Sequence, residues 1–156
     1  MSMKSTVIKS FLSAGLAAVA LAGIATPAYA NPEKGEHPEK LPAICEHKLA
    51  PSATVGDGVP GPLYYRLLQC YAAEGGYKGP IDGDLGNRSW VGVEKHLKEQ
   101  GLYKSDKFPG EQDPETTRGL ERFGIKFGGG RGTVNGFLNA DDYRDIAQAL
   151  NHMYAK

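Results

Sequence analysis

The sequence has no excess of charge of either sign. It holds 18 basic and 18 acidic residues, and the first thirty residues contain two lysines and no acid, so the remainder has 16 basic and 18 acidic residues, a net charge of −2. Proteins that bind nucleic acid usually carry a basic surface, so this balance argues against nucleic acid as a partner. The apolar run from Phe11 to Ile24 is also shorter than the roughly 20 residues of a transmembrane helix. We therefore expect no stable membrane insertion.

Motifs of common hydrolases and metal sites are missing as well. The four histidines (His37, His47, His96 and His152) show neither His-x-x-x-His nor His-Glu-x-x-His spacing, so zinc is unsupported. There is no Gly-x-Ser-x-Gly element, and the Gly-rich stretch at 128–132 lacks the Lys-Ser/Thr of a P-loop. The acidic residues do not form the ladder of a calcium loop. The sequence therefore favours a non-catalytic protein without a metal or cofactor.

The first thirty residues have the features of a secretory signal peptide. Lys4 and Lys9 give a positive start, an apolar stretch follows, and Ala-Tyr-Ala at 28–30 forms a small-x-small cleavage site. The residue directly after this site is Asn31 and not a cysteine, so a bacterial lipid anchor is not expected. We expect a mature chain that begins at Asn31 and is secreted or associated with the cell wall. An uncleaved membrane anchor is the alternative.

Cysteine is scarce, since the chain holds one pair, Cys45 and Cys70. In an exported protein this pair is expected to form a disulfide, whose loop of about 25 residues stabilises the fold by roughly 3 kcal/mol through its effect on the unfolded chain. A catalytic thiol is the alternative. Residues 31–61 are rich in proline, glycine and charge, which predicts a flexible linker that Cys45 brings to the domain.

Apolar residues recur with helical spacing in the remaining sequence. Pro62 suits the first position of a helix that extends to Glu74 and ends at Gly75-Gly76. A second helix is expected from Asn87 to Gln100, with Trp90, Val93 and Leu97 on one face. Within it, Glu94 and Lys98 are spaced to form an i, i+4 ion pair.

Two further helices are predicted from their start signals. Asp113 before Pro114 is typical of an N-cap followed by the first helical residue, and this third helix is expected to end near Gly124. Asn139 and Asp142 resemble a capping box at the start of a last helix, from Asn139 to about Tyr154. The sequence therefore predicts an all-α fold.

A pattern of a loop followed by a helix occurs twice in the sequence. A shift of 27 residues places Gly83 on Gly110 and Ser89 on Thr116, and the helical residues that follow also correspond. Chance similarity between short Gly-rich loops is the alternative. For a fainter third copy that starts at Gly136, chance is the stronger explanation.

The loop before the second helix reads Gly-Tyr-x-Gly-Pro-Ile-Asp-Gly-x-Leu-Gly, and Asp-Pro-Glu-Thr at 113–116 starts the third helix. This order resembles the peptidoglycan-binding family, whose repeat reads roughly Gly-Tyr-x-x-Gly-x-Ile-Asp-Gly-x-x-Gly-x-x-Thr between two helices. The resemblance covers residues 62–124, about half of the mature chain. The matching residues are Tyr77, Gly79, Ile81, Asp82, Gly83, Gly86, Ser89, Gly101, Leu102, Asp113, Pro114, Glu115, Thr116 and Leu120.

The resemblance implies a compact three-helix bundle that binds the bacterial cell wall. We therefore expect a small orthogonal three-helix bundle with an additional C-terminal helix and a disulfide-pinned N-terminal extension. The domain would span 62–124, and residues 125–156 would form a Gly-rich loop and a helix packed on the domain.

Some residues of this loop are expected to be structural and others to contact a ligand. Asp82 is expected to bond backbone N–H groups, and Gly79, Gly83 and Gly86 to supply positive φ or room. Aromatic faces and an arginine fork suit the sugars, amides and carboxylates of a glycan–peptide polymer. Packing or plain exposure is the alternative for each ligand-contact candidate. These candidates are Tyr77, Arg88, Trp90 and Tyr103.

The leading hypothesis is an exported, non-catalytic protein that binds peptidoglycan through a shallow groove near this loop. One alternative is a small secreted protein that binds another protein, such as an inhibitor of an exported enzyme. Another is a small wall hydrolase with unusual carboxylates.

Overall fold

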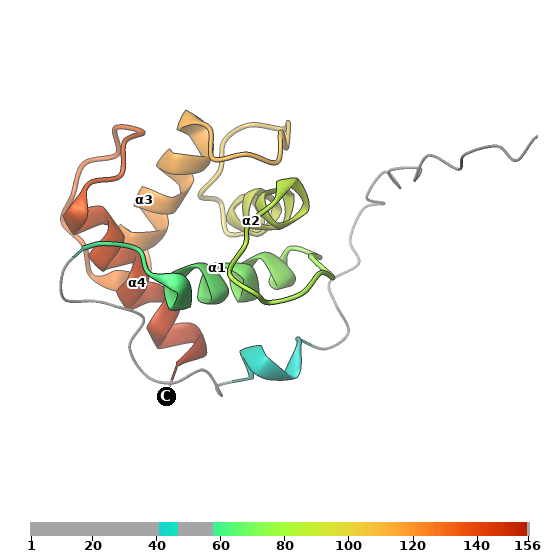
Figure 1. The fold of residues 1–156 in the computed structure, drawn as a ribbon. Coiled ribbons are helices and arrows are strands. Elements are labelled where there is room, and N and C mark those ends of the chain that lie inside the picture. Colours follow the sequence, from blue (N-terminus) through green and yellow to red (C-terminus); the bar gives the residue numbers. More distant parts are fainter. Residues whose placement is uncertain (1–40, 47–57, 156) are drawn as a thin grey trace, which may run out of the picture. The chain divides into compact units, whose positions relative to one another are not determined.

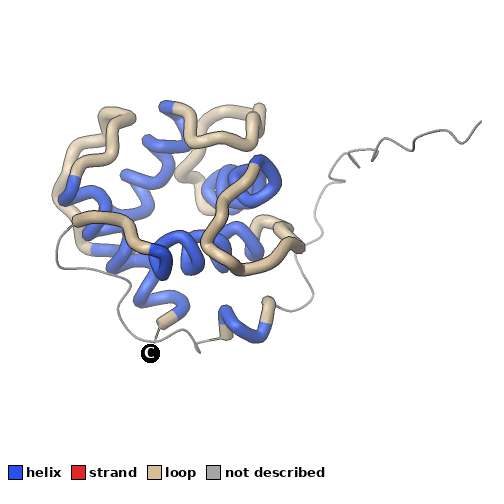
Figure 2. Tube along the Cα trace, in the orientation of Figure 1, coloured by secondary structure: helices blue, strands red, loops and turns tan. Residues whose placement is uncertain are grey.

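The computed structural model describes residues 41–46 and 58–155, which form four α-helices and one short 3-10 helix (Figure 1). The helices are α1 (Pro62–Glu74), α2 (Asn87–Glu99), α3 (Pro114–Gly128) and α4 (Ala140–Tyr154), and the 3-10 helix η1 is Ala43–Cys45. The described ranges contain no strand, so the expected all-α fold is confirmed (Figure 2). No helix in these ranges has the length and apolar character needed to cross a membrane. The predicted signal peptide and most of the predicted linker lie outside the described residues.

Proline and side-chain caps determine where three of the helices begin. Pro62 and Pro114 occupy the first positions of α1 and α3, where a missing N–H breaks no helical hydrogen bond. Asp113 caps α3 because its carboxylate accepts a hydrogen bond of 2.7 Å from the backbone N–H three residues later. At α4, Asn139 and Asp142 form the predicted capping box.

The third helix is longer than the sequence indicated. It was expected to end near Gly124, but it continues to Gly128, and Gly129 ends it in the left-handed conformation with φ of 78°. Gly124 lies instead in the contact with α4, where an added Cβ would be 3.1 Å from the Cβ of Asp145. A glycine that permits close helix packing therefore resembles a helix end in the sequence.

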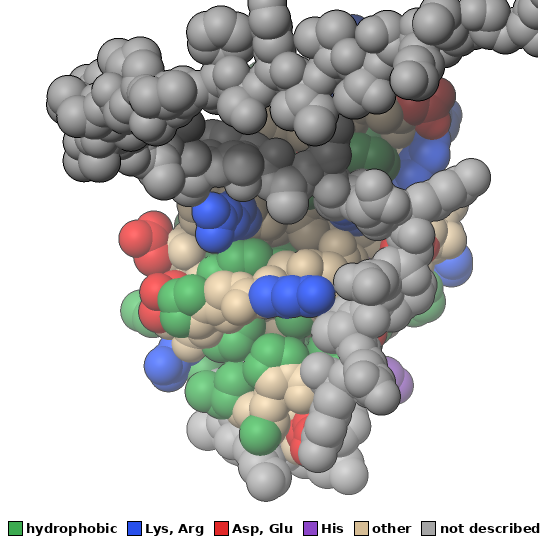
Figure 3. Space-filling view, turned by 90° about the vertical axis from the view of Figure 1, so that its right-hand side faces the viewer, with side chains coloured by type: hydrophobic (Ala, Val, Ile, Leu, Met, Phe, Trp, Pro, Cys, Tyr) green, Lys and Arg blue, Asp and Glu red, His purple; other side chains and the backbone are tan. Residues whose placement is uncertain are grey.

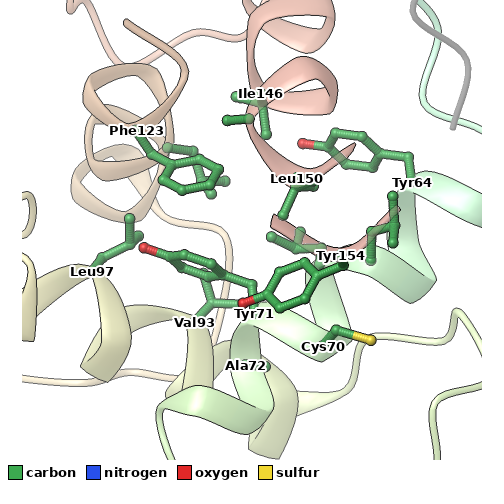
Figure 4. Packing of buried hydrophobic residues seen from close by; sticks show 14 of the residues in the cluster. Tyr64, Cys70, Tyr71, Ala72, Val93, Leu97, Phe123, Ile146, Leu150 and Tyr154 are labelled. Carbon is green, nitrogen blue, oxygen red and sulfur yellow. The ribbon is translucent and has the colours of Figure 1, made fainter. Parts of the chain in front are cut away.

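The four helices share one hydrophobic core (Figure 4). α1 packs against α2 and α3 packs against α4, while α1 also contacts α4. The rings of Tyr71 on α1 and Phe123 on α3 lie 4.6 Å apart between centroids and connect the two pairs. Leu97 from α2 and Leu150 from α4 are fully buried beside them. The additional C-terminal helix is therefore part of the same core.

Small residues allow α1 and α2 to approach closely. A Cβ added to Gly92 would lie 2.5 Å from the carbonyl oxygen of Ala72. A Cβ added to Gly75 would lie 2.0 Å from the carbonyl oxygen of Gly92. Both distances are shorter than van der Waals contact, so a larger residue at either position forces the two helices apart.

The predicted disulfide joins η1 to α1. Cys45 and Cys70 are bonded, with their Cα atoms 5.5 Å apart, and both are buried. Leu41 and Ile44 pack against the core from the same segment. The disulfide therefore attaches residues 41–46 to the helical bundle.

Three loops share one arrangement, in which a glycine with positive φ donates its N–H to a side chain of the preceding helix. The loop glycines, as we call them, are Gly83 (φ 92°), Gly110 (75°) and Gly136 (88°). Their acceptors, which we call the anchor residues, are Gln69 (2.7 Å), Glu94 (3.1 Å) and Glu121 (2.9 Å). The copy at Gly136 therefore has the same geometry as the other two, although chance was the stronger explanation from sequence.

The anchor residues occupy equivalent positions, since each is the eighth residue of its helix, α1, α2 or α3. Each loop then returns toward the start of the helix that it follows. A Cβ added to Gly83 would lie 3.3 Å from the carbonyl oxygen of Pro62, and one added to Gly136 would lie 3.3 Å from that of Pro114. Because the loops return in this way, consecutive helices begin near one another.

Candidate functional site

The loop between α1 and α2 is held by the buried side chain of Gln69. Its Oε1 accepts the N–H of Gly83, while its Nε2 donates to Oδ1 of Asp82 and to the carbonyl oxygen of Asp84, both at 2.9 Å. Oδ1 of Asp82 also accepts the N–H of Asp84 at 2.9 Å. The hydrogen bond from Gln69 lowers the pKa of the Asp82 carboxyl group. Asp82 thus bonds backbone within the loop, as its residue type predicted.

The glycines of this loop have different roles. Gly83 has positive φ, and Gly79 leaves room for an aromatic side chain, because an added Cβ would lie 2.3 Å from the hydroxyl oxygen of Tyr77. Gly86 does neither, since its φ is −85° and an added Cβ would meet nothing within 4 Å. The prediction that Gly86 supplies positive φ or room is therefore wrong. It is the N-cap residue of α2.

Tyr77 lies in the loop between α1 and α2, and Arg88 lies in the first turn of α2 that follows it. Tyr77 is half-buried, and its hydroxyl donates a 3.0 Å hydrogen bond to the carbonyl oxygen of Pro80. Burial raises the pKa of Tyr77 and the Asp82 carboxylate raises it further, while a hydrogen bond with Ser89 and, to a smaller extent, the charge of Arg88 oppose the rise. The side chain of Arg88 is exposed. We call Tyr77, Asp82 and Arg88 the loop rim.

Trp90 and Tyr103 lie outside the loop rim. Trp90 follows Arg88 by two positions, so its side chain leaves α2 about 160° around the helix axis from Arg88. Trp90 is half-buried against the core. Tyr103 is 3% exposed, stacks on Phe108, and donates its hydroxyl to the carbonyl oxygen of Lys107 at 3.0 Å. The four ligand-contact candidates therefore do not form one surface.

Figure 3 views the molecule from the side that is on the right in Figure 1. On this face, lysine and arginine side chains lie beside an area of hydrophobic side chains (Figure 3). A surface of this mixed kind offers a partner both charge and apolar contact area.

Glu94 has a different partner from the one expected. It was predicted to pair with Lys98 along α2, but it is fully buried, and its carboxylate accepts hydrogen bonds from the loop before α3. The ammonium group of Lys98 instead contacts Oδ1 of Asp106 at 2.7 Å. The i, i+4 spacing alone was misleading because the Glu94 carboxylate has better donors in the tertiary structure, namely backbone N–H groups shielded from water.

Two features were missed in the sequence. The anchor residues Glu94 and Glu121 could have been found from their position, since polar residues 27 apart fall on the core side of two aligned helices. Phe137 follows the loop glycine Gly136 and is 78% exposed, with its N–H donated to Oδ1 of Asn135 at 2.8 Å. Sequence offers no signal for this exposure, because a buried and an exposed phenylalanine look alike.

Among the described residues, no group of three or more His, Cys, Asp or Glu side chains is arranged to hold a metal ion. His96, one of the four histidines, packs edge-on against Tyr71 with ring centroids 4.5 Å apart. Its Nδ1 lies 3.1 Å from Oε2 of Glu99.

No family model, curated protein or solved structure matches the chain. The link to peptidoglycan-binding domains therefore remains a resemblance carried by the residues of the loop and the helices that flank it.

Proposed function

We propose that this chain is an exported, non-catalytic protein that binds peptidoglycan through the loop rim. The observation that carries the proposal is the loop between α1 and α2. Its Gly-Tyr and Ile-Asp-Gly pattern resembles that of peptidoglycan-binding domains, Gln69 holds its turn at Asp82 and Gly83, and Arg88 follows the loop in the first turn of α2.

The chemistry of the loop rim suits a glycan–peptide polymer. The exposed guanidinium of Arg88 presents a planar fork that binds a carboxylate with two parallel hydrogen bonds, and the peptide stems of the polymer carry carboxylates. The half-buried ring of Tyr77 offers an apolar face to a sugar ring. Contact through so few groups predicts weak binding that decreases with salt.

Export is supported by two independent features. The first thirty residues have the charge, apolar stretch and cleavage site of a signal peptide. The buried Cys45–Cys70 bond is of the kind that persists in oxidising compartments outside the cytosol. A secreted or wall-associated location therefore agrees with the proposed ligand.

Co-sedimentation with purified sacculi tests the proposal. We expect the exported protein to appear in the pellet at low salt, and Arg88→Ala to weaken this binding about tenfold or more, because a lost hydrogen bond to a charged group costs about 1.5–3 kcal/mol. Arg131→Ala is the matched control, since Arg131 is also an exposed arginine and lies in the loop after α3.

Each outcome of this experiment separates the hypotheses. If the unmodified protein stays in the supernatant at low and moderate salt, peptidoglycan binding is excluded. If Arg88→Ala and Arg131→Ala bind equally well, the loop rim is not the binding surface. Release of soluble muropeptides in the same tube would favour a wall hydrolase.

A further inference from the structure

The three anchor residues perform the same structural task with different chemistry. The loop glycine Gly83 donates its N–H to the carboxamide of Gln69, whereas Gly110 donates to the carboxyl group of Glu94. A carboxamide has no proton to gain or lose between pH 3 and 8, but a carboxyl group titrates in this range. We call the loop between α1 and α2 the first loop and the loop between α2 and α3 the second loop. The second loop is therefore held by a titratable side chain, whereas the first loop is held by a neutral one.

The hydrogen bonds of Glu94 are divided unequally between its two oxygens. Oε1 accepts the N–H of Gly110 at 3.1 Å, the N–H of Glu111 at 3.3 Å and the hydroxyl of Thr116 at 3.1 Å. Oε2 accepts only the N–H of Gly110, which it shares with Oε1, also at 3.1 Å. A proton on Oε2 therefore leaves the three bonds to Oε1 in place. Neutral Glu94 then has the shape and the acceptor of Gln69.

The surroundings of Glu94 act on its charge in both directions. From the neighbouring segments, Asp113, the N-cap residue of α3, and the hydroxyl group of Tyr103 interact with it electrostatically, and on its own helix the ammonium of Lys98 is engaged with Asp106. The N–H groups and the Thr116 hydroxyl favour the carboxylate. Burial outweighs them and raises the pKa of Glu94, and the charge of Asp113 raises it further.

We propose that Glu94 on α2 is a proton-binding switch that acts on the second loop. It changes the hydrogen bond to Gly110 with pH, while the Gln69–Gly83 bond of the first loop stays the same. In the ionised state both oxygens of Glu94 accept the Gly110 N–H. In the neutral state, after Oε2 has taken a proton from solvent, Oε1 alone accepts it. The loop rim lies on the first loop and is held by the residue that does not titrate.

The switch also makes folding stability depend on pH. Because folding raises the pKa of Glu94, the folded protein keeps this proton over a pH range, just above the ordinary glutamate value, where the unfolded chain has already released it. Stability therefore decreases as pH rises through this range. Below the range the contribution of neutral Glu94 is present in full.

The amide resonances of Gly83 and Gly110, followed by NMR from pH 3.5 to 8 in the exported protein, test the proposal. We expect the Gly110 amide to shift with a midpoint above the ordinary glutamate pKa, and Glu94→Gln to abolish this shift. Gly83 should not follow that midpoint, because its acceptor Gln69 does not titrate and the pKa of Asp82, which Gln69 also bonds, is lowered and not raised. Gln69→Glu should introduce a new titration at Gly83.

Three results would overturn the proposal. The first is a Gly110 amide that stays constant while the protein remains folded, and the second is a shift that persists unchanged in Glu94→Gln. The third is failure of Glu94→Gln to fold, because the proposal requires a neutral anchor residue to fit at this position. As a second measurement, the difference in unfolding midpoint between pH 5 and pH 7 should become smaller in Glu94→Gln.

Discussion

The close contact between α1 and α2 can be tested with two glycines that occupy the same helical position. Gly92 and Gly119 are the sixth residues of α2 and α3. A Cβ added to Gly92 would lie 2.5 Å from the carbonyl oxygen of Ala72, which is backbone and cannot move without its helix. A Cβ added to Gly119 would lie 2.9 Å from Cδ1 of Leu97, the flexible end of a side chain.

The two substitutions are therefore expected to change the free energy of unfolding by different amounts. Alanine in place of glycine favours a helix by about 1 kcal/mol at both positions. Overpacking at Gly92 should cost about 3 kcal/mol, the upper end of the usual range, because the opposing atom is backbone, so Gly92→Ala should destabilise the protein by about 2 kcal/mol after the helical gain. At Gly119 a rotamer change of Leu97 costs about 0.5–1.5 kcal/mol, so Gly119→Ala should leave stability nearly unchanged.

Urea unfolding at 25 °C measures both variants. We expect the urea midpoint to fall for Gly92→Ala and to stay near that of the unmodified protein for Gly119→Ala, with the same denaturant slope in both. The effect of alanine on the unfolded chain is common to the two variants and cancels in their comparison. Equal destabilisation by the two substitutions, or a neutral Gly92→Ala, would refute the assignment of Gly92 to a backbone contact.

The remaining predictions concern the disulfide and the capping box. Replacement of both Cys45 and Cys70 by alanine should lower the free energy of unfolding by about 3 kcal/mol, and thiol labelling of the non-reduced protein should fail, whereas quantitative labelling would contradict the bond. Asn139→Ala removes the oxygen that accepts the N–H groups of Asp141 and Asp142 and should cost about 1 kcal/mol in urea unfolding, while Asn139→Ser should recover most of it. An equal loss in both Asn139 variants would argue against the cap.

Features that depend on neighbours in sequence could be predicted. The starts of α1, α3 and α4 follow from Pro62, the Asp113-Pro114 pair and the capping box at Asn139, because a cap and its N–H donors lie within three residues. The bonding of backbone by Asp82 belongs to the same class, since its carboxylate accepts an N–H two residues later.

Features that depend on contacts between residues far apart in the sequence could not be predicted. Gly124 resembled a helix end because nothing near it in sequence shows that Asp145 and Ile146 of α4 approach it. Glu94 resembled half of a surface ion pair because its true donors, the N–H groups of Gly110 and Glu111, come from a loop sixteen and seventeen residues away.

The candidate site was also predicted in part from residue types and decided in part by packing. Residue types alone selected Tyr77, Arg88, Trp90 and Tyr103 as side chains that suit a glycan–peptide ligand. Packing decided which of them share a surface, because the core buries Tyr103 and the turn of α2 separates Trp90 from Arg88.

The sequence by itself determined the all-α class, the pairing of its two cysteines and most helix starts, because each follows from local hydrogen bonding, helical periodicity or the absence of any other thiol. Only the tertiary structure decided what Gly92, Gly119 and the buried carboxyl group of Glu94 do. Gly92 and Gly119 are the same residue at the same helical position, and Gln69 and Glu94 are nearly the same shape. Their roles differ because of the atoms that folding places opposite them: a backbone carbonyl or a methyl group for the glycines, and different backbone donors for the side chains.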